Sequence, residues 1–237
     1  FTGKQMVQVT TIILKFDLPM RTPNFKYVRK RKELVELLQN KGIQDQSVLA
    51  AIGKIERQLF IPDTALHGHA YENKAFPIGA EQTISHPYTV AFQSQLLQVV
   101  KGDKILEIGT GSGYQAAVLA ELGADLYTIE RQKELYDKTT PLLKSLGYTQ
   151  VKYYYGDGYK GKPAFAPFDK IIVTAAAPEI PVALLEQLKI GGMLVIPLNN
   201  KKGNQDMLRL TKIQQQEIHK EVFEEFSFVP MLKETNE

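Results

Sequence analysis

The densest group of chemically capable residues is a glycine-rich turn, EIGTGSG, at 107–113. It follows a short apolar run, so we expect a strand to end here and a helix to begin. Glycines let the backbone approach a ligand closely, and a helix N-terminus presents free N–H groups. The spacing is G-x-G-x-G, whereas dinucleotide sites favour G-x-G-x-x-G.

Glu107 gives this turn a carboxylate. A negative charge here would repel a pyrophosphate but would suit a cationic ligand. It could neutralise the sulfonium or the ammonium group of S-adenosylmethionine, directly or through a water. The turn therefore favours S-adenosylmethionine over a nicotinamide dinucleotide, and a glycine turn without any ligand is the alternative.

Two more acidic residues follow predicted strands. Glu130 ends the next strand, 21 residues after Gly109, and an acidic residue near this spacing accepts hydrogen bonds from ribose hydroxyls. Asp157 stands between Gly156 and Gly158, where it could accept a hydrogen bond from an adenine amino group; a plain turn is the alternative. Open α/β sheets bind ligands at the carboxyl ends of their strands, so we expect these acids to share one site.

The elements that must position these residues alternate between helix and strand from residue 88 onward. This alternation predicts a doubly wound, mostly parallel Rossmann-like sheet with helices on both faces. Beyond it, two strands joined by a polar turn predict a C-terminal antiparallel hairpin. Strands are expected at 104–108, 126–130, 151–155, 170–174, 193–198, 207–213 and 221–228, and helices at 88–100, 114–122, 132–146 and 181–188.

The first part of the chain follows a different pattern. Apolar spacing predicts helices at 28–38 and 48–55, which form an N-terminal helical cap. A long loop-like tract at 61–87 ends in GAEQTISHPY, and loops of this length are usually functional. We therefore divide the chain into an N-terminal extension at 1–25 with a short strand at 7–16, helices and a substrate loop at 26–87, and a cofactor-binding domain at 88–237 that forms one compact unit with 26–87.

Composition excludes several classes of function. The 237 residues include no cysteine, which removes disulfides, thiolate metal sites and a cysteine nucleophile. His67 and His69, without a carboxylate cluster nearby, make a poor metal site, so we expect no metal. No apolar run approaches the roughly 20 residues of a membrane span. The net charge of +3 is modest, although the basic run at 26–32 leaves RNA binding open.

Five segments resemble the protein-L-isoaspartate O-methyltransferase family. The glycine turn alone indicates only a class I methyltransferase, whereas the QTIS tract with Pro87 and the AAPEIP loop are more specific to this family. The resemblance runs in order from residue 28 to residue 232. The segments are GAEQTISHPYTVA (79–91), KILEIGTGSGYQ (104–115), YYGDGY (154–159), PFDKIIVTAAAPEIP (167–181) and LKIGGMLVIPL (188–198).

The resemblance implies an activity and a set of site residues. The activity is methyl transfer from S-adenosylmethionine to the free α-carboxyl of an L-isoaspartyl residue in a damaged protein; the ester then collapses to a succinimide that reopens partly to aspartate. The implied residues are Ser85 in catalysis; Glu107, Gly109, Gly111, Glu130, Asp157 and Gly158 in cofactor binding; and Ile84, Ser85, Val229 and Pro230 in substrate binding.

The residues are consistent with this chemistry without a general base. An α-carboxyl has a pKa of about 3.3–3.7, so the acceptor is already anionic at neutral pH. Ser85 is then interpreted as a hydrogen-bond donor that orients the carboxylate, and the alternative is a helix N-cap. Glu81, His86 and Met231 depart from the family's usual residues, which leaves the peptide preference open.

Another class I methyltransferase, acting on a small molecule or on RNA, is the alternative function. We expect a cytoplasmic monomer whose partners are isoaspartyl proteins and peptides, and not nucleic acid or membranes.

Overall fold

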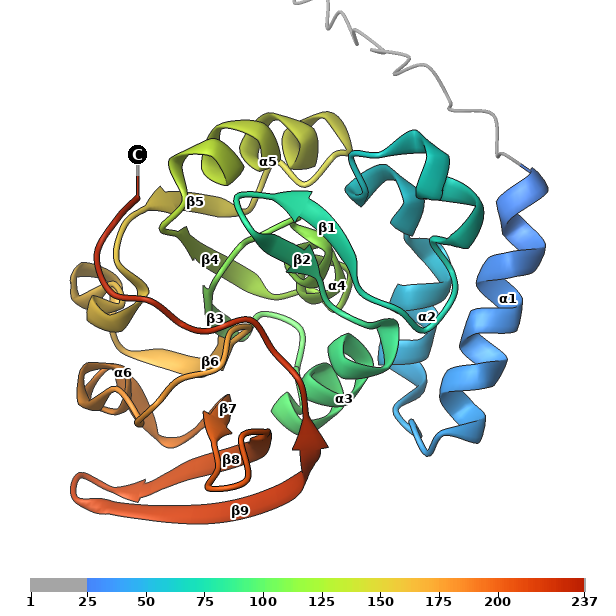
Figure 1. Cartoon of the computed structure of the whole chain (residues 1–237). Helices are drawn as coiled ribbons and strands as arrows, with labels where there is room; N and C mark the ends of the chain where they lie inside the picture. Colours follow the sequence, from blue (N-terminus) through green and yellow to red (C-terminus); the bar gives the residue numbers. More distant parts are fainter. Residues whose placement is uncertain (1–24, 237) are drawn as a thin grey trace, which may run out of the picture.

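Seven strands form one sheet in the order β5-β4-β3-β6-β7-β8-β9 (Figure 1). The first five of these run parallel, and β8 and β9 are antiparallel to their neighbours. The computed structural model describes residues 25–236, so the strand predicted at 7–16 lies outside the described residues. The strands are β3 (Lys104–Ile108), β4 (Asp125–Glu130), β5 (Lys152–Tyr155), β6 (Phe168–Val173), β7 (Leu188–Asn199), β8 (Gln205–Gln214) and β9 (Glu217–Phe226).

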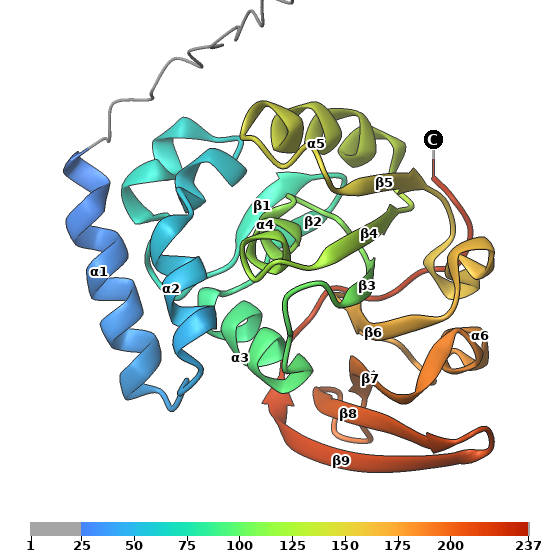
Figure 2. The same cartoon turned by 180° about the vertical axis from the view of Figure 1, so that it is seen from behind.

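Helices cover both faces of this sheet, as predicted. The helices α3, α4 and α5 share a core with one face, and α6 shares a core with the other. The first two helices form an outer layer on α3 and α4, and this layer is the predicted N-terminal cap (Figure 2). The helices are α1 (Phe25–Asn40), α2 (Gln46–Lys54), α3 (Pro87–Leu97), α4 (Tyr114–Glu121), α5 (Lys133–Ser145) and α6 (Val182–Glu186).

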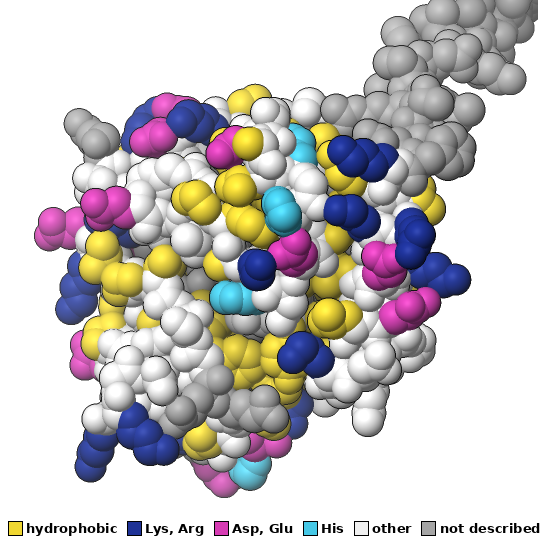
Figure 3. All heavy atoms as spheres, turned by 45° about the vertical axis from the view of Figure 1, so that its right-hand side comes forward, with side chains coloured by type: hydrophobic (Ala, Val, Ile, Leu, Met, Phe, Trp, Pro, Cys, Tyr) yellow, Lys and Arg dark blue, Asp and Glu magenta, His cyan; other side chains and the backbone are white. Residues whose placement is uncertain are grey.

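Burial on both faces explains why the central strands are apolar throughout. In β3, Ile105 packs into one core and Leu106 into the other, and both side chains are fully buried. Parallel strands covered by helices have this composition, because neither face meets water. None of the described helices is long and apolar enough to cross a membrane. On the side of the N-terminal helices, charged side chains spread over the surface with apolar ones between them (Figure 3).

The tract at 61–87 is more ordered than the loop we predicted. It contains β1 (Phe76–Gly79) and β2 (Gln82–Ile84), which pair as an antiparallel hairpin. The loop residues Ala80 and Glu81 have φ of 47° and 56°. Positive φ at both loop residues is the mark of a type I′ turn, which usually carries Asn-Gly or Asp-Gly. The sequence therefore shows no hairpin signal here.

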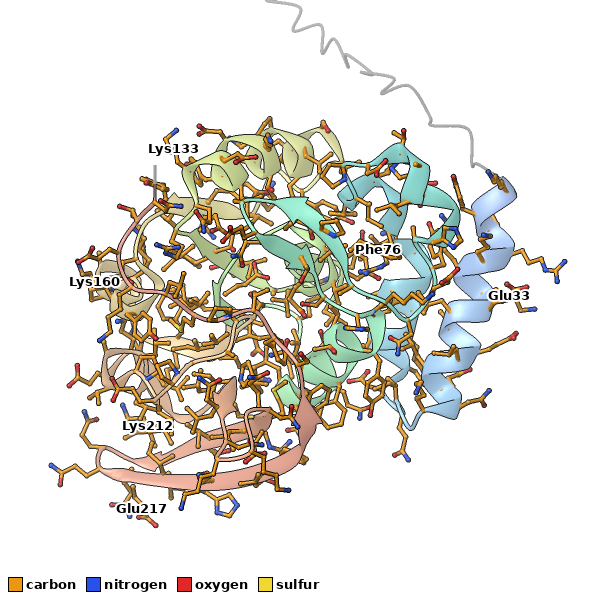
Figure 4. The ribbon with its side chains drawn as sticks, in the orientation of Figure 1. Glu33, Phe76, Lys133, Lys160, Lys212 and Glu217 are labelled. Atoms are coloured by element: carbon orange, nitrogen blue, oxygen red, sulfur yellow. The ribbon has the colours of Figure 1, made fainter. Side chains whose placement is uncertain are left out.

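This hairpin is anchored to the N-terminal helices. Phe76 of β1 is buried in the same core as α1 and α2 and lies between the hairpin and those helices (Figure 4). Two short 3-10 helices, η1 (Arg57–Phe60) and η2 (Thr64–His69), lead into it from α2. The cap thus supports the segment that carries the QTIS tract.

After β9, residues 229–236 cross the carboxyl edge of the sheet, and we call this segment the C-terminal strap (Figure 1). It is tied to the loop after β6, because the Ala176 N–H donates to the Val229 carbonyl at 2.7 Å and the Met231 N–H donates to the Ala176 carbonyl at 2.6 Å. Farther along, Arg131 Nε donates to the Glu234 carbonyl at 2.7 Å. The strap therefore covers the edge at which the predicted acids lie.

Candidate functional site

A cavity opens beside the glycine turn at the carboxyl edge of the sheet, and we call it the glycine-turn cavity. Its walls come from the ends of β3 and β4, from the loops after β3, β4, β5 and β6, from Gln82 of β2, and from the strap. Among the residues predicted for the site, its lining includes Gly109, Gly111, Glu130, Gly158, Val229 and Pro230.

Two of these positions accept only glycine. Gly109 has φ of 95°, and a Cβ added there would lie 2.5 Å from Thr174 Oγ1. At Gly158 a Cβ would lie 2.3 Å from Ile108 Cγ2. Both distances are well inside van der Waals contact. The missing side chains therefore let Thr174 and Ile108 pack directly against the backbone of these two cavity-lining residues.

Glu130 holds the turn and faces the cavity at the same time. Its Oε2 accepts the Gly111 N–H at 2.8 Å, and its Oε1 accepts the Gln132 N–H at 2.8 Å. Burial raises the pKa of this carboxyl, and the hydrogen bonds from the backbone oppose that rise. An ionised carboxylate has about four acceptor sites, so Glu130 keeps capacity to accept hydrogen bonds from a ligand's hydroxyl groups.

Glu107 does not line this cavity. Its side chain is fully buried, and its Oε2 accepts the Thr128 hydroxyl at 2.6 Å. The Thr128 hydroxyl lies in turn 2.7 Å from the Thr110 hydroxyl. The other carboxyl oxygen of Glu107, Oε1, has no hydrogen-bond partner among the described residues. Glu107 thus contacts the glycine turn from behind, through two threonines.

Burial also changes the charge expected at Glu107. Removal from water raises the pKa of this carboxyl to about 8, more than the Thr128 hydrogen bond lowers it. At neutral pH the group is therefore mostly protonated. A role for Glu107 beside a bound sulfonium stays a prediction; the complete burial of its side chain is the feature that the sequence does not show.

Asp157 lies next to the cavity without lining it. It is half-buried, and its Oδ1 accepts the Tyr159 N–H at 2.9 Å. This bond begins the short 3-10 helix η3 (Gly158–Lys160). The turn places Gly158 at the cavity wall.

Ser85 follows β2 and lines two further cavities. One of them includes Gly109, Thr110 and Tyr114 in its wall, and the other includes His86 and Val229. The N-cap of α3 is His86, whose side chain makes no capping hydrogen bond. The Ser85 hydroxyl forms no hydrogen bond within residues 25–236. Capping of α3, the alternative for Ser85, is therefore not what the structure shows.

The remaining predicted substrate residues lie in different surroundings. Ile84 is buried and lines none of these three cavities. Val229 lines the glycine-turn cavity and also the Ser85 cavity that contains His86. Pro230 lines the glycine-turn cavity alone. Among the departures from the family pattern, His86 lines a Ser85 cavity and Met231 lines the glycine-turn cavity.

Thr174 also lies in the walls of these cavities, although the sequence alone does not single it out. It borders the glycine-turn cavity and both Ser85 cavities. Its hydroxyl donates to the Gly109 carbonyl at 2.7 Å and lies 3.0 Å from the Ile108 carbonyl. The available signal was its place at the carboxyl end of a predicted parallel strand.

The site and the sheet together define a class of protein. Five parallel strands, an antiparallel pair at one edge and a glycine turn after the central strand β3 make a Rossmann-like methyltransferase fold.

Comparison with known proteins then gives the family. The family model described as protein-L-isoaspartate(D-aspartate) O-methyltransferase matches residues 29–236. A protein-L-isoaspartate O-methyltransferase of Christiangramia forsetii is 54% identical over 212 residues, which are 90% of this chain and 98% of that protein. This chain therefore belongs to the protein-L-isoaspartate(D-aspartate) O-methyltransferase family.

Solved structures agree with this assignment. A structure titled protein-L-isoaspartate O-methyltransferase is 28% identical with a TM-score of 0.77, and the match covers 84% of this chain and 65% of that longer one. A Plasmodium falciparum protein assigned to the same enzyme class was solved in complex with S-adenosyl-L-homocysteine. It is 26% identical with a TM-score of 0.74, over 86% of this chain and 98% of that one.

The raised pKa of Glu107 predicts a pH-dependent stability. The folded state keeps this proton up to about pH 8, whereas the unfolded chain loses it near the ordinary value of 4.5. Because the folded state then binds more protons between these values, the free energy of unfolding decreases as the pH rises. Glu107→Gln has no such proton to lose. Its free energy of unfolding minus that of the wild type should therefore increase with pH across this range, by up to about 1.4 kcal/mol per pH unit.

Urea unfolding at several values between about pH 5 and pH 8 measures this difference. Glu186→Gln, which changes an exposed residue of α6, serves as the control. A difference between Glu107→Gln and the wild type that stays constant with pH would contradict the prediction.

Proposed function

We propose that this chain transfers a methyl group from S-adenosylmethionine to the free α-carboxyl of L-isoaspartyl residues in damaged proteins. The resulting ester collapses to a succinimide, which reopens partly to aspartate. The observation that carries this proposal is the family match over residues 29–236. The shared wall between the glycine-turn cavity and the Ser85 cavities supports it, because a methyl donor and an acceptor must meet there.

The residues around the glycine-turn cavity fit a nucleoside cofactor. Gly109 and Gly111 let the backbone approach it, and Glu130 has acceptor capacity for the ribose hydroxyls. Gly158 lines the cavity where the base would lie, with the Asp157 carboxylate beside it. Glu107 contributes by holding the turn from behind. When bound, S-adenosylmethionine supplies an electrophilic methyl group on a positively charged sulfur.

The chain's own residues have little proton chemistry to do. The acceptor carboxylate is anionic at neutral pH, so no group needs to remove a proton from it. In this proposal the Ser85 hydroxyl donates a hydrogen bond to one carboxylate oxygen, which turns the other toward the donor. Ile84, Val229 and Pro230 hold the substrate backbone on either side. Orientation of this kind can supply much of a rate enhancement.

The protein partners in this proposal are isoaspartyl proteins and peptides. The monomeric state, the cytoplasmic location, and the expectation of neither nucleic acid nor membrane as a partner stay predictions.

A pair of peptides tests the activity. Labelled methyl should appear as a base-labile ester on an isoaspartyl peptide but not on its aspartyl twin, because only the isoaspartyl residue presents a free α-carboxyl at that position. Scintillation counting before and after mild alkali measures the ester. Equal labelling of both peptides would reject the repair function, and no labelling of either would point to another class I methyltransferase.

Gly109→Ala tests the cofactor cavity. The new Cβ would clash with Thr174 and would sit at positive φ, so we expect S-adenosylhomocysteine to bind at least about tenfold more weakly, a loss of about 1.4 kcal/mol. Calorimetry measures this affinity. Gly203→Ala shares the positive φ of 87° but meets nothing within 4 Å, so it controls for backbone strain. Equal affinities of the two variants would contradict the placement.

Ser85→Ala tests the orienting hydrogen bond. A hydrogen bond to a charged group contributes about 1.5–3 kcal/mol, so kcat should fall on the order of tenfold to a hundredfold. The affinity for S-adenosylhomocysteine should stay nearly unchanged. Ser145→Ala, at the exposed end of α5, is the matched control. An unchanged kcat would show that the Ser85 hydroxyl is not needed for turnover.

A further inference from the structure

Arg57, the first residue of η1, is a fully buried cation beside Ser85. Its guanidinium donates to three backbone carbonyls: Nε to Ala70 at 2.9 Å, Nη2 to Lys74 at 3.2 Å and Nη2 to Ser85 at 2.9 Å. The carbonyls belong to three successive segments, the end of η2, the approach to β1 and the residue after β2. Arg57 therefore fixes the backbone that carries the Ser85 hydroxyl.

The charge of Arg57 is not compensated by a carboxylate. Within residues 25–236 it forms no ion pair, and its Nη1 has no hydrogen-bond partner. Its nearest aromatic contact is the Tyr114 ring, with the guanidinium carbon 4.6 Å from the ring centroid. Burial lowers the pKa of this guanidinium to about 10, so it is still charged at neutral pH. A buried, unpaired charge is costly, and an apolar side chain would avoid that cost.

This charge lies close to the Ser85 cavities, although Arg57 does not line them. Two of its contacts, Ser85 and Tyr114, are wall residues of the same small cavity. The imidazole of His86, which lines the other cavity, has its pKa lowered first by burial and then by the charge of Arg57. In a low-dielectric interior such a charge acts strongly on an anion nearby.

We propose that Arg57 is a positioning residue for the acceptor carboxylate. Its three hydrogen bonds hold residue 85 in place, and its uncompensated charge attracts an anion into the cavity beside the Ser85 hydroxyl. This inference rests on the proposed function, in which the acceptor is a carboxylate. Because the ester product is neutral, Arg57 favours binding of the reactant over retention of the product.

Two variants separate the charge from the fold. Arg57→Met removes the charge and should raise KM for an isoaspartyl peptide on the order of tenfold, because the charge acts mainly on the ground state; loss of the hydrogen bond to the Ser85 carbonyl should lower kcat as well. Arg57→Lys restores the charge and should recover most of that loss, although an ammonium cannot span three carbonyls as a planar fork does. Arg209→Met is the matched control, because Arg209 of β8 forms an ion pair with Glu221 of β9.

A charge-neutral competitor gives a second readout. The same peptide with its isoaspartyl α-carboxyl replaced by an amide cannot be methylated and lacks the negative charge. We expect the wild type and Arg57→Lys to bind the acid more tightly than the amide, and Arg57→Met to lose this preference. Binding of S-adenosylhomocysteine, measured by calorimetry, should be equal in all three proteins and reports that they are folded.

The outcomes distinguish the inference from the function itself. Wild-type methylation of the isoaspartyl peptide tests the function, and only differences among the variants test Arg57. The inference is overturned if Arg57→Lys is as impaired in KM as Arg57→Met, or if kcat alone falls. It is also overturned if neither variant binds S-adenosylhomocysteine, since Arg57 would then serve the fold. If Arg57→Met alone fails to fold, the inference is tested on Arg57→Lys. Tighter binding of the acid peptide than of the amide peptide by Arg57→Lys supports the inference, and loss of that preference overturns it.

Discussion

The glycine turn after β3 is held in place by side chains from the strands on either side of it, and the rest of the site depends on this constraint. Glu130 from β4 accepts the Gly111 N–H, and Thr174, after β6, donates to the Gly109 carbonyl. These bonds satisfy backbone groups that a tight turn would otherwise leave unpaired. The turn is thereby fixed in a conformation that glycine adopts without strain, with Gly109 and Gly111 in the wall of the cavity.

The same constraint brings the two halves of the site together. Thr174 bonds to the turn and also forms part of the wall around Ser85, and Val229 of the strap borders both regions. A donor against the glycines and an acceptor at Ser85 would therefore be separated by residues that the sheet itself positions. The strap adds a second tie to the loop after β6.

The sequence predicts the sheet well because buried parallel strands are short apolar runs that alternate with helical segments. It also places Gly109 and Glu130 at one edge, since the carboxyl ends of parallel strands meet there. It does not predict the β1–β2 hairpin, because Ala80 and Glu81 lack turn chemistry, nor the complete burial of the Glu107 side chain. Arg57 gives no signal at all, since its partners are carbonyls that only the tertiary fold brings together.

Glu107 and Arg57 are both buried without an ion pair, yet they reach opposite states. A carboxylic acid escapes the cost of burial by keeping its proton, which the raised pKa of Glu107 reflects. A guanidinium loses its proton far less readily, so Arg57 keeps its charge at neutral pH. The interior beside Ser85 is therefore positive, whereas the space behind the glycine turn is nearly neutral. An anion is favoured on the Ser85 side, which is the side from which a carboxylate would approach a methyl donor held against the glycines.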